Sequence, residues 1–180
     1  MKILVVVDMQ NDFITGSLGT PEAQAIVPNV KKKIEEYIAN EDMIFYTYDT
    51  HYDDYLETRE GKKLPIKHCI EGSWGWEIPE ELMPDYRYRR RVGKNTFGCY
   101  NLPNMIRELF DDIDDEIAEI EVLGLCSDIC VISNALLLKS YFYEECDITV
   151  DATCCAGVTP ETHEAALKTM EMCQINVRRD

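Results

Sequence analysis

Apolar residues follow two different patterns along the chain, and the two patterns alternate from one end to the other. Short continuous apolar runs indicate strands buried on both faces of a sheet, and apolar residues that recur every three or four positions indicate helices. Strands are predicted over residues 2–7, 43–48, 86–92, 119–125, 147–150 and 175–177, and helices over residues 28–40, 102–110, 160–173 and from 127 onward. Residues 74–82, which Pro79 interrupts, form a short helix at most. Without internal repeats or a linker, this alternation predicts a single α/β domain over residues 1–180. Its expected fold is a doubly wound open sheet of about six parallel strands with helices on both faces.

Residues 122–138 contain a change from strand to helix that carries a candidate for chemistry. Ser127 and Asp128 are typical helix-start residues. The apolar residues that follow can share one helical face: Val131, Ala135, Leu138 and Phe142. Cys130 falls in the first turn, where backbone N–H groups are unpaired and the helix dipole is positive. A thiol there is expected to ionise more easily than a free one, whose pKa is about 8.5. Cys130 is therefore a candidate nucleophile, the alternative being a buried structural cysteine.

Three groups with useful chemistry lie at strand ends: Asp8 after the first strand, Lys94 after the third and Cys130 after the fourth. The carboxyl ends of parallel strands meet at one edge of a sheet, so these groups can converge. A carboxylate can take the proton of the thiol, while an ammonium group and a helix end stabilise the thiolate. Taken singly, Asp8 could merely cap a loop and Lys94 could be a solvated charge.

The longest irregular stretch, residues 49–73, contains two of the three histidines of the chain. Loops of this length inside a compact domain are usually functional or disordered. Asp49 and His51 open the stretch and His68 lies near its end, so together they can supply oxygen and nitrogen ligands to a divalent metal. The alternative is a pair of solvated loop histidines. The remaining histidine, His163, lies in the first turn of the last helix and is expected at the surface.

Composition excludes several classes of partner. The chain has 46% hydrophobic and 29% charged residues, as soluble globular proteins do, and its net charge of −16 argues against binding nucleic acid or an anionic membrane. No apolar run approaches a membrane span, and neither a dinucleotide-binding G-x-G-x-x-G nor a Walker loop is present. Eight cysteines without a C-x-x-C pair and without an export signal predict reduced thiols in the cytoplasm.

Three motifs in this order resemble the isochorismatase-like cysteine hydrolase family. They are Val-Val-Val-Asp-Met-Gln-Asn-Asp-Phe at residues 5–13, Gly-Lys at 93–94 and Gly-Leu-Cys-Ser-Asp-Ile-Cys-Val at 124–131. The resemblance extends from the first strand to the last helix. It implies a catalytic triad with Asp8 as base, Lys94 as electrostatic partner and Cys130 as nucleophile. It also implies an oxyanion hole formed by the backbone N–H groups of Cys126 and Cys130, and a cis peptide between Leu125 and Cys126.

Within this family, Asp49, His51 and His68 are similar to the metal site of nicotinamidases. That resemblance implies one more ligand from the intervening loop, for which Glu60 is preferred to Glu57. Zinc is the first choice of metal, although iron or manganese also suits a mixed site of carboxylate and imidazole ligands.

The chain departs from the nicotinamidase pattern just before His68. Nicotinamidases often carry an aromatic–proline pair there, whereas residues 64–67 read Leu-Pro-Ile-Lys. Either Phe13 and Tyr100 form the wall against which a substrate ring stacks, or the substrate is a different one.

The resemblance therefore implies a metal-containing cysteine amidase that hydrolyses nicotinamide to nicotinate and ammonia through a thioester. One alternative is a related hydrolase acting on another small amide or carbamoyl compound. Another, from a different class, is a metal-stabilised binding domain in which Cys130 is inert. The expected partner is a small amide, with no nucleic acid and no membrane, and the resemblance also allows a homo-oligomer.

Overall fold

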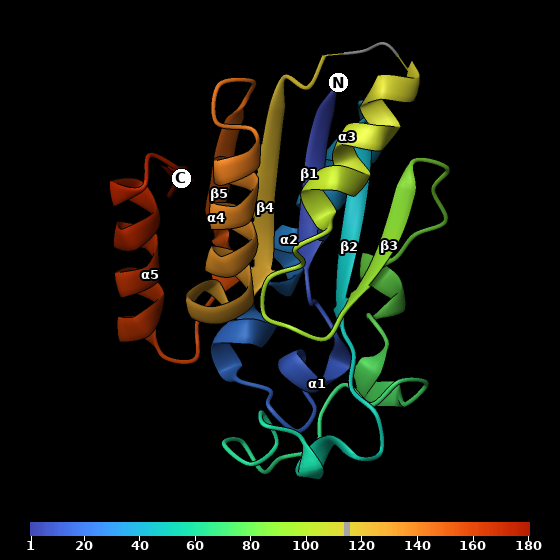
Figure 1. Ribbon diagram of the computed structural model, residues 1–180, viewed down its shortest axis with the longest axis vertical. Helices are drawn as coiled ribbons and strands as arrows, with labels where there is room; N and C mark the ends of the chain where they lie inside the picture. Colours follow the sequence, from blue (N-terminus) through green and yellow to red (C-terminus); the bar gives the residue numbers. More distant parts are fainter. Residues whose placement is uncertain (114–115) are drawn as a thin grey trace.

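The computed structural model describes residues 1–113 and 116–180, and these form a sheet of parallel strands in the order β3-β2-β1-β4-β5-β6 (Figure 1). The six strands are β1 (Lys2–Val7), β2 (Met43–Asp49), β3 (Arg89–Lys94), β4 (Glu119–Leu125), β5 (Asp147–Ala156) and β6 (Asn176–Arg178). The order reverses direction between β1 and β4, which makes this a doubly wound sheet. The predicted fold class is confirmed.

The strands at the centre of the sheet are buried on both faces, as their continuous apolar runs predict. Val5 lies between Phe45 of β2 and Val122 of β4 in the strand register, and all three side chains are essentially inaccessible. Burying one such side chain stabilises the fold by about 1.5–3 kcal/mol.

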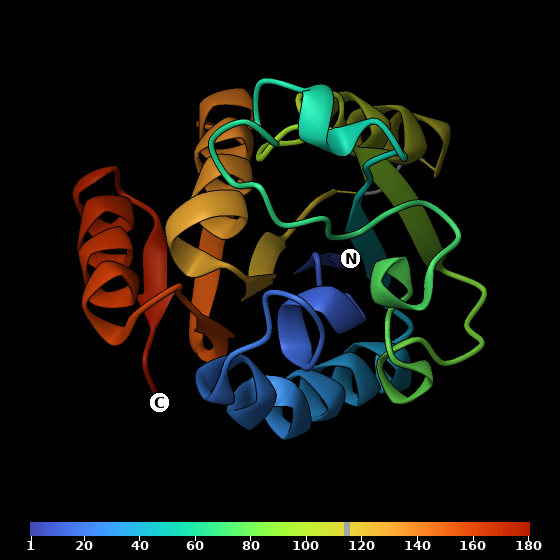
Figure 2. The same ribbon diagram turned by 90° about the horizontal axis from the view of Figure 1, so that it is seen from below.

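Helices cover both faces of the sheet (Figures 1 and 2). The helices are α1 (Asn11–Ile14), α2 (Pro21–Ala39), α3 (Leu102–Ile113), α4 (Ile132–Tyr141) and α5 (Pro160–Met172), and a π-helical turn, η4 (Ser127–Val131), precedes α4. Figure 2 shows α2 on one face and α3 and α4 on the other, with α5 beside α4. The predicted apolar face of the fourth helix is confirmed, because its residues are completely buried: Val131, Ala135, Leu138 and Phe142.

The second helix begins earlier than predicted. Thr20 caps it by accepting a hydrogen bond from the N–H of Ala23 at 3.0 Å, and Pro21 occupies its first position. Pro28 was expected to open the helix because proline suits a first turn, but it lies inside the helix. The stabilisation from the Thr20 cap and from Pro21 at the first position therefore exceeds the cost of the one backbone hydrogen bond that is lost at the interior Pro28.

Other boundaries also differ from the prediction. β3 begins three residues later than expected and includes Lys94, while β5 continues past Asp151 to Ala156. The predicted short helix over residues 74–82 consists of two single 3₁₀ turns, η2 (Trp74–Trp76) and η3 (Glu80–Leu82). A third such turn is η1 (Tyr55–Glu57). α3 continues three residues past its predicted end at residue 110, to Ile113, and residues 114–115 lie outside the described residues.

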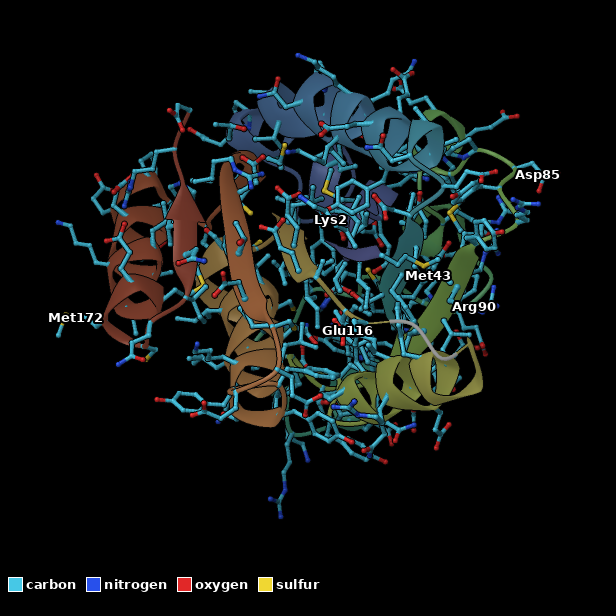
Figure 3. The ribbon with its side chains drawn as sticks, turned by 90° about the horizontal axis from the view of Figure 1, so that it is seen from above. Lys2, Met43, Asp85, Arg90, Glu116 and Met172 are labelled. Carbon is cyan, nitrogen blue, oxygen red and sulfur yellow. The ribbon has the colours of Figure 1, made fainter. Side chains whose placement is uncertain are left out.

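The carboxyl ends of the strands gather at the lower edge of the sheet in Figure 1, together with α1 and the long loop after β2. The amino ends, where Lys2 and Met43 begin β1 and β2, lie at the opposite edge (Figure 3). In residues 1–113 and 116–180, no helix is both long enough and apolar enough to cross a membrane.

Candidate active site and metal centre

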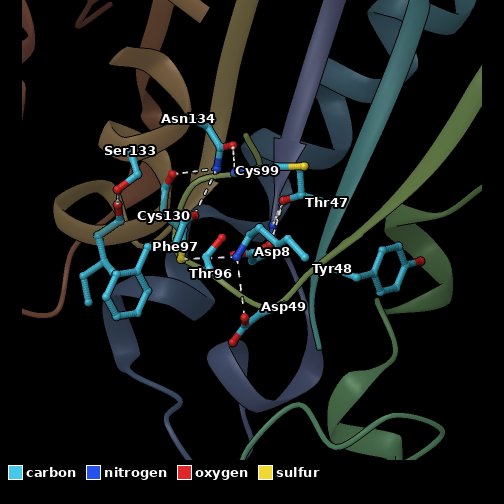
Figure 4. A network of polar contacts seen from close by, with 12 residues as sticks. Asp8, Thr47, Tyr48, Asp49, Thr96, Phe97, Cys99, Cys130, Ser133 and Asn134 are labelled. Carbon is cyan, nitrogen blue, oxygen red and sulfur yellow. Dashed lines mark hydrogen bonds and ion pairs between the residues drawn. The ribbon is translucent and has the colours of Figure 1, made fainter. Parts of the chain in front are cut away.

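Asp8, Lys94 and Cys130 meet at the carboxyl edge of the sheet. Figure 4 shows Asp8 and Cys130 there. Nζ of Lys94 lies 2.6 Å from Oδ2 of Asp8 and donates a hydrogen bond to Sγ of Cys130 at 3.6 Å. All three are buried: Asp8 is 0% exposed, and Lys94 and Cys130 are each 6% exposed. The structure thus brings together the three groups that the sequence places at separate strand ends.

Thr47 of β2 holds the Asp8 carboxylate from the neighbouring strand. Its hydroxyl donates a 2.6 Å hydrogen bond to Oδ1 of Asp8 and accepts one from the Asp8 N–H at 3.2 Å. Sequence reasoning missed Thr47, although a single threonine between two tyrosines in a buried strand was a weak signal. Its relevance depends on the pairing of β2 with β1, which sets Thr47 opposite Val7.

The charges of the triad follow from burial and mutual contact. Burial raises the pKa of the Asp8 carboxyl above its ordinary value, although the Lys94 ammonium group opposes the rise. Burial disfavours the charge of Lys94, but the Asp8 carboxylate and the other acidic groups around it raise its pKa above the ordinary value. Lys94 is therefore a fixed cation, and Asp8 is a stronger base than an exposed aspartate.

The expectation that the Cys130 thiol ionises easily is wrong for the site without substrate. Burial raises the pKa of this thiol well above its ordinary value, the Asp8 carboxylate adds to the rise, and Lys94 offsets only part of it. The position in the first helical turn is outweighed because almost no water reaches the sulfur. The thiol therefore needs a neighbouring base to accept its proton, and Asp8 adjoins it.

The peptide between Leu125 and Cys126 is cis, as the resemblance implies. The Cys126 carbonyl accepts hydrogen bonds from the N–H groups of Ile129 and Val131, each at 3.0 Å. The second of these spans five residues, so Cys130 lies in a π-type turn and not in a regular first turn of an α-helix. That the N–H groups of Cys126 and Cys130 form an oxyanion hole stays a prediction.

A cavity of about 260 Å³ adjoins Cys130. It is lined by Phe13, Leu18, Thr20, Asp49, Glu60, Leu64, His68, Phe97, Cys126, Ile129, Cys130 and Val158. Cys130 thus shares one small chamber with three of the predicted metal ligands and with Phe13. The walls between these polar groups are mostly aliphatic or aromatic.

Tyr100 does not line this cavity, contrary to the expectation that it forms a ring wall. It is 79% exposed and borders a separate hollow beside β3. The turn that follows β3 instead presents Phe97 to the cavity. Sequence reasoning missed Phe97 because the conformation of a turn decides which of two nearby aromatic residues faces inward.

Asp49, His51 and His68 form a compact donor set in which one ligand atom from each lies within 4.8 Å of the others. Nε2 of His51 lies 3.0 Å from Oδ2 of Asp49, and Nε2 of His68 lies 3.5 Å from the same oxygen. Oε1 of Glu60 lies 3.7 Å from Nε2 of His51 and 3.9 Å from Nε2 of His68. Glu57 is exposed, so the structure favours Glu60 as the further carboxylate.

The donor set can take the protonation state that a metal requires. Burial lowers the pKa of His68, but the hydrogen bonds to Asp49 and Ile66 and the nearby carboxylate charges raise it above the ordinary value, so a bound cation would replace a ring proton. Nδ1 of His68 lies 2.8 Å from the carbonyl oxygen of Ile66, to which it donates, so in the neutral ring the lone pair is on Nε2 and faces Asp49. Burial opposes ionisation of Asp49, but hydrogen bonds with His51 and His68 and the charge of Lys94 hold its pKa below the ordinary value. A buried carboxylate and two imidazoles with converging lone pairs fit a divalent cation.

Comparison with known proteins agrees with this geometry. The sequence profile of the Isochorismatase domain matches residues 2–179. The uncharacterized isochorismatase family protein PncA of Bacillus subtilis (strain 168) is 28% identical over 151 residues, which are 75% of this chain and 76% of that protein. Among solved structures, the nicotinamidase/pyrazinamidase PncA from Bacillus subtilis superposes with a TM-score of 0.84 at 25% identity over 99% of both chains. The N-carbamoylsarcosine amidase from Thermoplasma acidophilum superposes with a TM-score of 0.78 at 26% identity over 99% of this chain and 95% of that one. Because the profile spans nearly the whole chain, the protein belongs to the isochorismatase family of hydrolases.

Proposed function

We propose that this hydrolase is a metal-containing cysteine amidase that converts nicotinamide to nicotinate and ammonia. The observation that carries the proposal is the shared cavity, in which the Cys130 thiol lies in the same small chamber as Asp49, Glu60 and His68. The similarity to a nicotinamidase/pyrazinamidase over 99% of both chains supports the same activity.

Cys130, Asp8 and Lys94 perform the bond-breaking steps in this proposal. Asp8 accepts the thiol proton as the sulfur of Cys130 attacks the amide carbonyl, and Lys94 stabilises the negative charge that passes between them. The N–H groups of Cys126 and Cys130 donate to the developing oxyanion. Asp8 then gives its proton to the departing ammonia, and a nicotinoyl thioester is left on Cys130. In the second half, Asp8 takes a proton from water as the water attacks the thioester carbonyl. The C–S bond then breaks, Asp8 returns the proton to the Cys130 sulfur, and the acid that leaves ionises to nicotinate.

Asp49, His51, His68 and Glu60 would hold the metal, and zinc is the first choice for a site with two imidazole nitrogens. A bound cation supplies a Lewis-acidic point that can interact with the pyridine nitrogen. Fixing the ring in this way places the amide carbonyl against Cys130, and positioning of this kind can lower a barrier by several kcal/mol.

The walls of the cavity suit a small flat substrate. Phe13 and Phe97 both line it, and the Phe13 ring centroid lies 5.6 Å from that of His68. Leu64 and Ile129 complete an apolar surface between the nucleophile and the metal ligands. An aromatic ring buried there replaces water on these side chains, which favours binding.

A second candidate is hydrolysis of a small carbamoyl compound. Two observations favour it. The first is the similarity to an N-carbamoylsarcosine amidase at 26% identity. The second is that Leu64, which precedes Pro65, lines the cavity, whereas nicotinamidases often have an aromatic–proline pair just before the histidine that corresponds to His68. A related fold with a different wall could accept a non-aromatic amide.

Trapping the acyl-enzyme tests the proposed function. Acid quenching of metal-loaded protein during turnover of nicotinamide should yield a peptide in which Cys130 carries a nicotinoyl group, detected by mass spectrometry. The Cys130→Ala variant should give neither this adduct nor ammonia, whereas Cys173→Ala, at an exposed cysteine, should give both. An adduct on another cysteine, or ammonia release by Cys130→Ala, would count against the assignment. An inert Cys130, as in a binding domain, would give no adduct in any variant.

A further inference from the structure

The last helix is attached to the turn that carries the nucleophile. Nδ1 of His163, in the first turn of α5, lies 2.8 Å from Oγ of Ser127 in η4. Ser127 is completely buried, and His163 is half-buried and not free at the surface, as the sequence had suggested. Figures 1 and 2 both show α5 beside the gold and orange segment of η4 and α4.

A second contact attaches the loop between β5 and α5 to η4. The N–H of Val158, which precedes α5, lies 3.1 and 3.2 Å from the two carboxylate oxygens of Asp128. Gly157 packs so closely under α5 that a Cβ there would lie 2.9 Å from the Cβ of His163. The loop between β5 and α5 is therefore docked on η4 through specific contacts and close packing.

The two halves of the nucleophile turn have different supports. Its second half is held from within its own helix, where Ser133 donates to the carbonyl of Ile129 at 2.6 Å and Asn134 donates to that of Cys130 at 2.8 Å. Among the side-chain hydrogen bonds of the described residues, those of Ser127 and Asp128 in the first half run to the loop and helix after β5. Side-chain hydrogen bonds thus tie the first half of the turn to α5 and to the loop before it.

We propose that His163 is a positioning residue for the oxyanion hole, acting through Ser127. Ser127 directly follows Cys126, whose N–H is one of the two donors in the proposed mechanism, and it lies three residues before Cys130. Fixing the Ser127 side chain fixes the rotation of the peptide groups next to it, and with them the direction of these N–H groups. His163 does not line the cavity, so it does not contact a substrate bound there directly.

This role predicts a particular kinetic signature. The oxyanion exists in the transition state and not in the bound substrate, so a misdirected donor lowers kcat and leaves KM nearly unchanged. Removal of a whole oxyanion donor costs about a hundredfold to a thousandfold in kcat, and misalignment should cost part of that. We expect a fall in kcat of roughly tenfold to a hundredfold when the His163 contact is lost.

The test compares two variants of similar shape. His163→Asn keeps a polar atom at the place of Nδ1 that can donate to or accept from Ser127, whereas His163→Leu keeps the branching and removes the hydrogen bond. The prediction is that the leucine variant loses kcat while the asparagine variant retains most of it. Glu164→Gln, at the next position of α5 where Glu164 pairs with Arg179, is the control and should behave as wild type. Ser127→Ala should reproduce the leucine effect, and combining the two should add little, because both remove one contact.

The reaction is followed on nicotinamide and, separately, as the burst of p-nitrophenol released when p-nitrophenyl acetate acylates Cys130. The burst needs the oxyanion hole and does not need nicotinamide recognition, so it tests this inference even if the proposed substrate is wrong. Equal kcat and equal bursts for the leucine and asparagine variants would overturn the positioning role. So would a loss that appears only in KM, or one that merely follows a lowered melting temperature in both variants.

Discussion

Lys94 and Asp49 lie 3.6 Å apart, from Nζ to Oδ1, and this contact joins the proposed catalytic triad to the proposed metal ligands. The same ammonium group lies 2.6 Å from Asp8 and contacts the Cys130 sulfur. One buried cation thus neutralises two buried carboxylates that belong to different parts of the site. The Lys94 side chain therefore fixes the position of the Cys130 thiol relative to Asp49 of the metal-ligand set.

Replacing Lys94 should therefore be far more damaging than removing an ordinary lysine. Lys94→Met would leave Asp8 and Asp49 as like charges without their shared cation, which disfavours ionisation of the base. Breaking a buried ion pair by removing one partner typically costs about 3–5 kcal/mol of stability. We expect kcat/KM to fall by three orders of magnitude or more, and the melting temperature to fall as well. Steady-state kinetics measures kcat/KM and calorimetry measures the melting temperature, with Lys139→Met on α4 as the control. A variant that keeps a tenth of the activity would contradict the role assigned to Lys94.

Thr47→Val should shift the pH profile. The hydroxyl donates to the ionised form of Asp8 and so lowers its pKa; without it, that pKa rises. The base must be ionised to act, so the acid limb of log kcat/KM against pH should move to higher pH. Thr149→Val is a matched control, since Thr149 is also buried in a strand and donates to a carboxylate, that of Glu119, at 2.6 Å. An acid limb that stays in place in Thr47→Val, or moves equally in both variants, would show that Asp8 does not depend on Thr47.

Purified protein should contain about one divalent metal per chain, because residues 1–113 and 116–180 contain one compact set of metal-ligating side chains. The double variant His51→Ala/His68→Ala should lose the metal, as measured by plasma emission spectroscopy, whereas His163→Asn should retain it. Glu60→Gln should weaken binding and Glu57→Gln should not, because only Glu60 faces both histidine rings. Full metal content in the double histidine variant would place the ion elsewhere.

We predict different effects on substrate binding for two aromatic residues of the turn after β3, because only one of them lines the cavity. Phe97→Ala should raise KM for nicotinamide, because the ring lines the cavity, while Tyr100→Ala should leave it unchanged. Loss of one aromatic contact of this size should raise KM roughly tenfold. An effect of Tyr100→Ala that matches or exceeds that of Phe97→Ala would show that the substrate binds in the hollow beside β3.

Much of this arrangement could be predicted because it depends on local rules. A short continuous apolar run such as residues 3–7 indicates a strand buried on both faces, and parallel strands bring Asp8, Lys94 and Cys130 to one edge. The start of the second helix shows where local rules conflict: Pro28 and Pro21 each suit a first helical position, and the Thr20 cap decides between them.

The remaining features depend on contacts between distant segments. Thr47 matters only because β2 pairs with β1, and Ser127 meets His163 only because α5 packs beside η4. The raised pKa of Cys130 results from how completely the chain encloses it, which a helix-start motif does not reveal. The choice of Phe97 over Tyr100 depends on the conformation of one turn.

The most direct test of the account is the ratio of kcat/KM for nicotinamide to that for benzamide, measured by ammonia release from metal-loaded protein. Both substrates present the same amide to Cys130, but only nicotinamide has a ring nitrogen to interact with the cation held by Asp49, His51 and His68. We predict that nicotinamide is preferred by roughly a hundredfold or more, and that removing the metal abolishes the preference by raising KM for nicotinamide. Equal values for the two amides in the metal-loaded protein would contradict the account and favour an amidase for another small substrate.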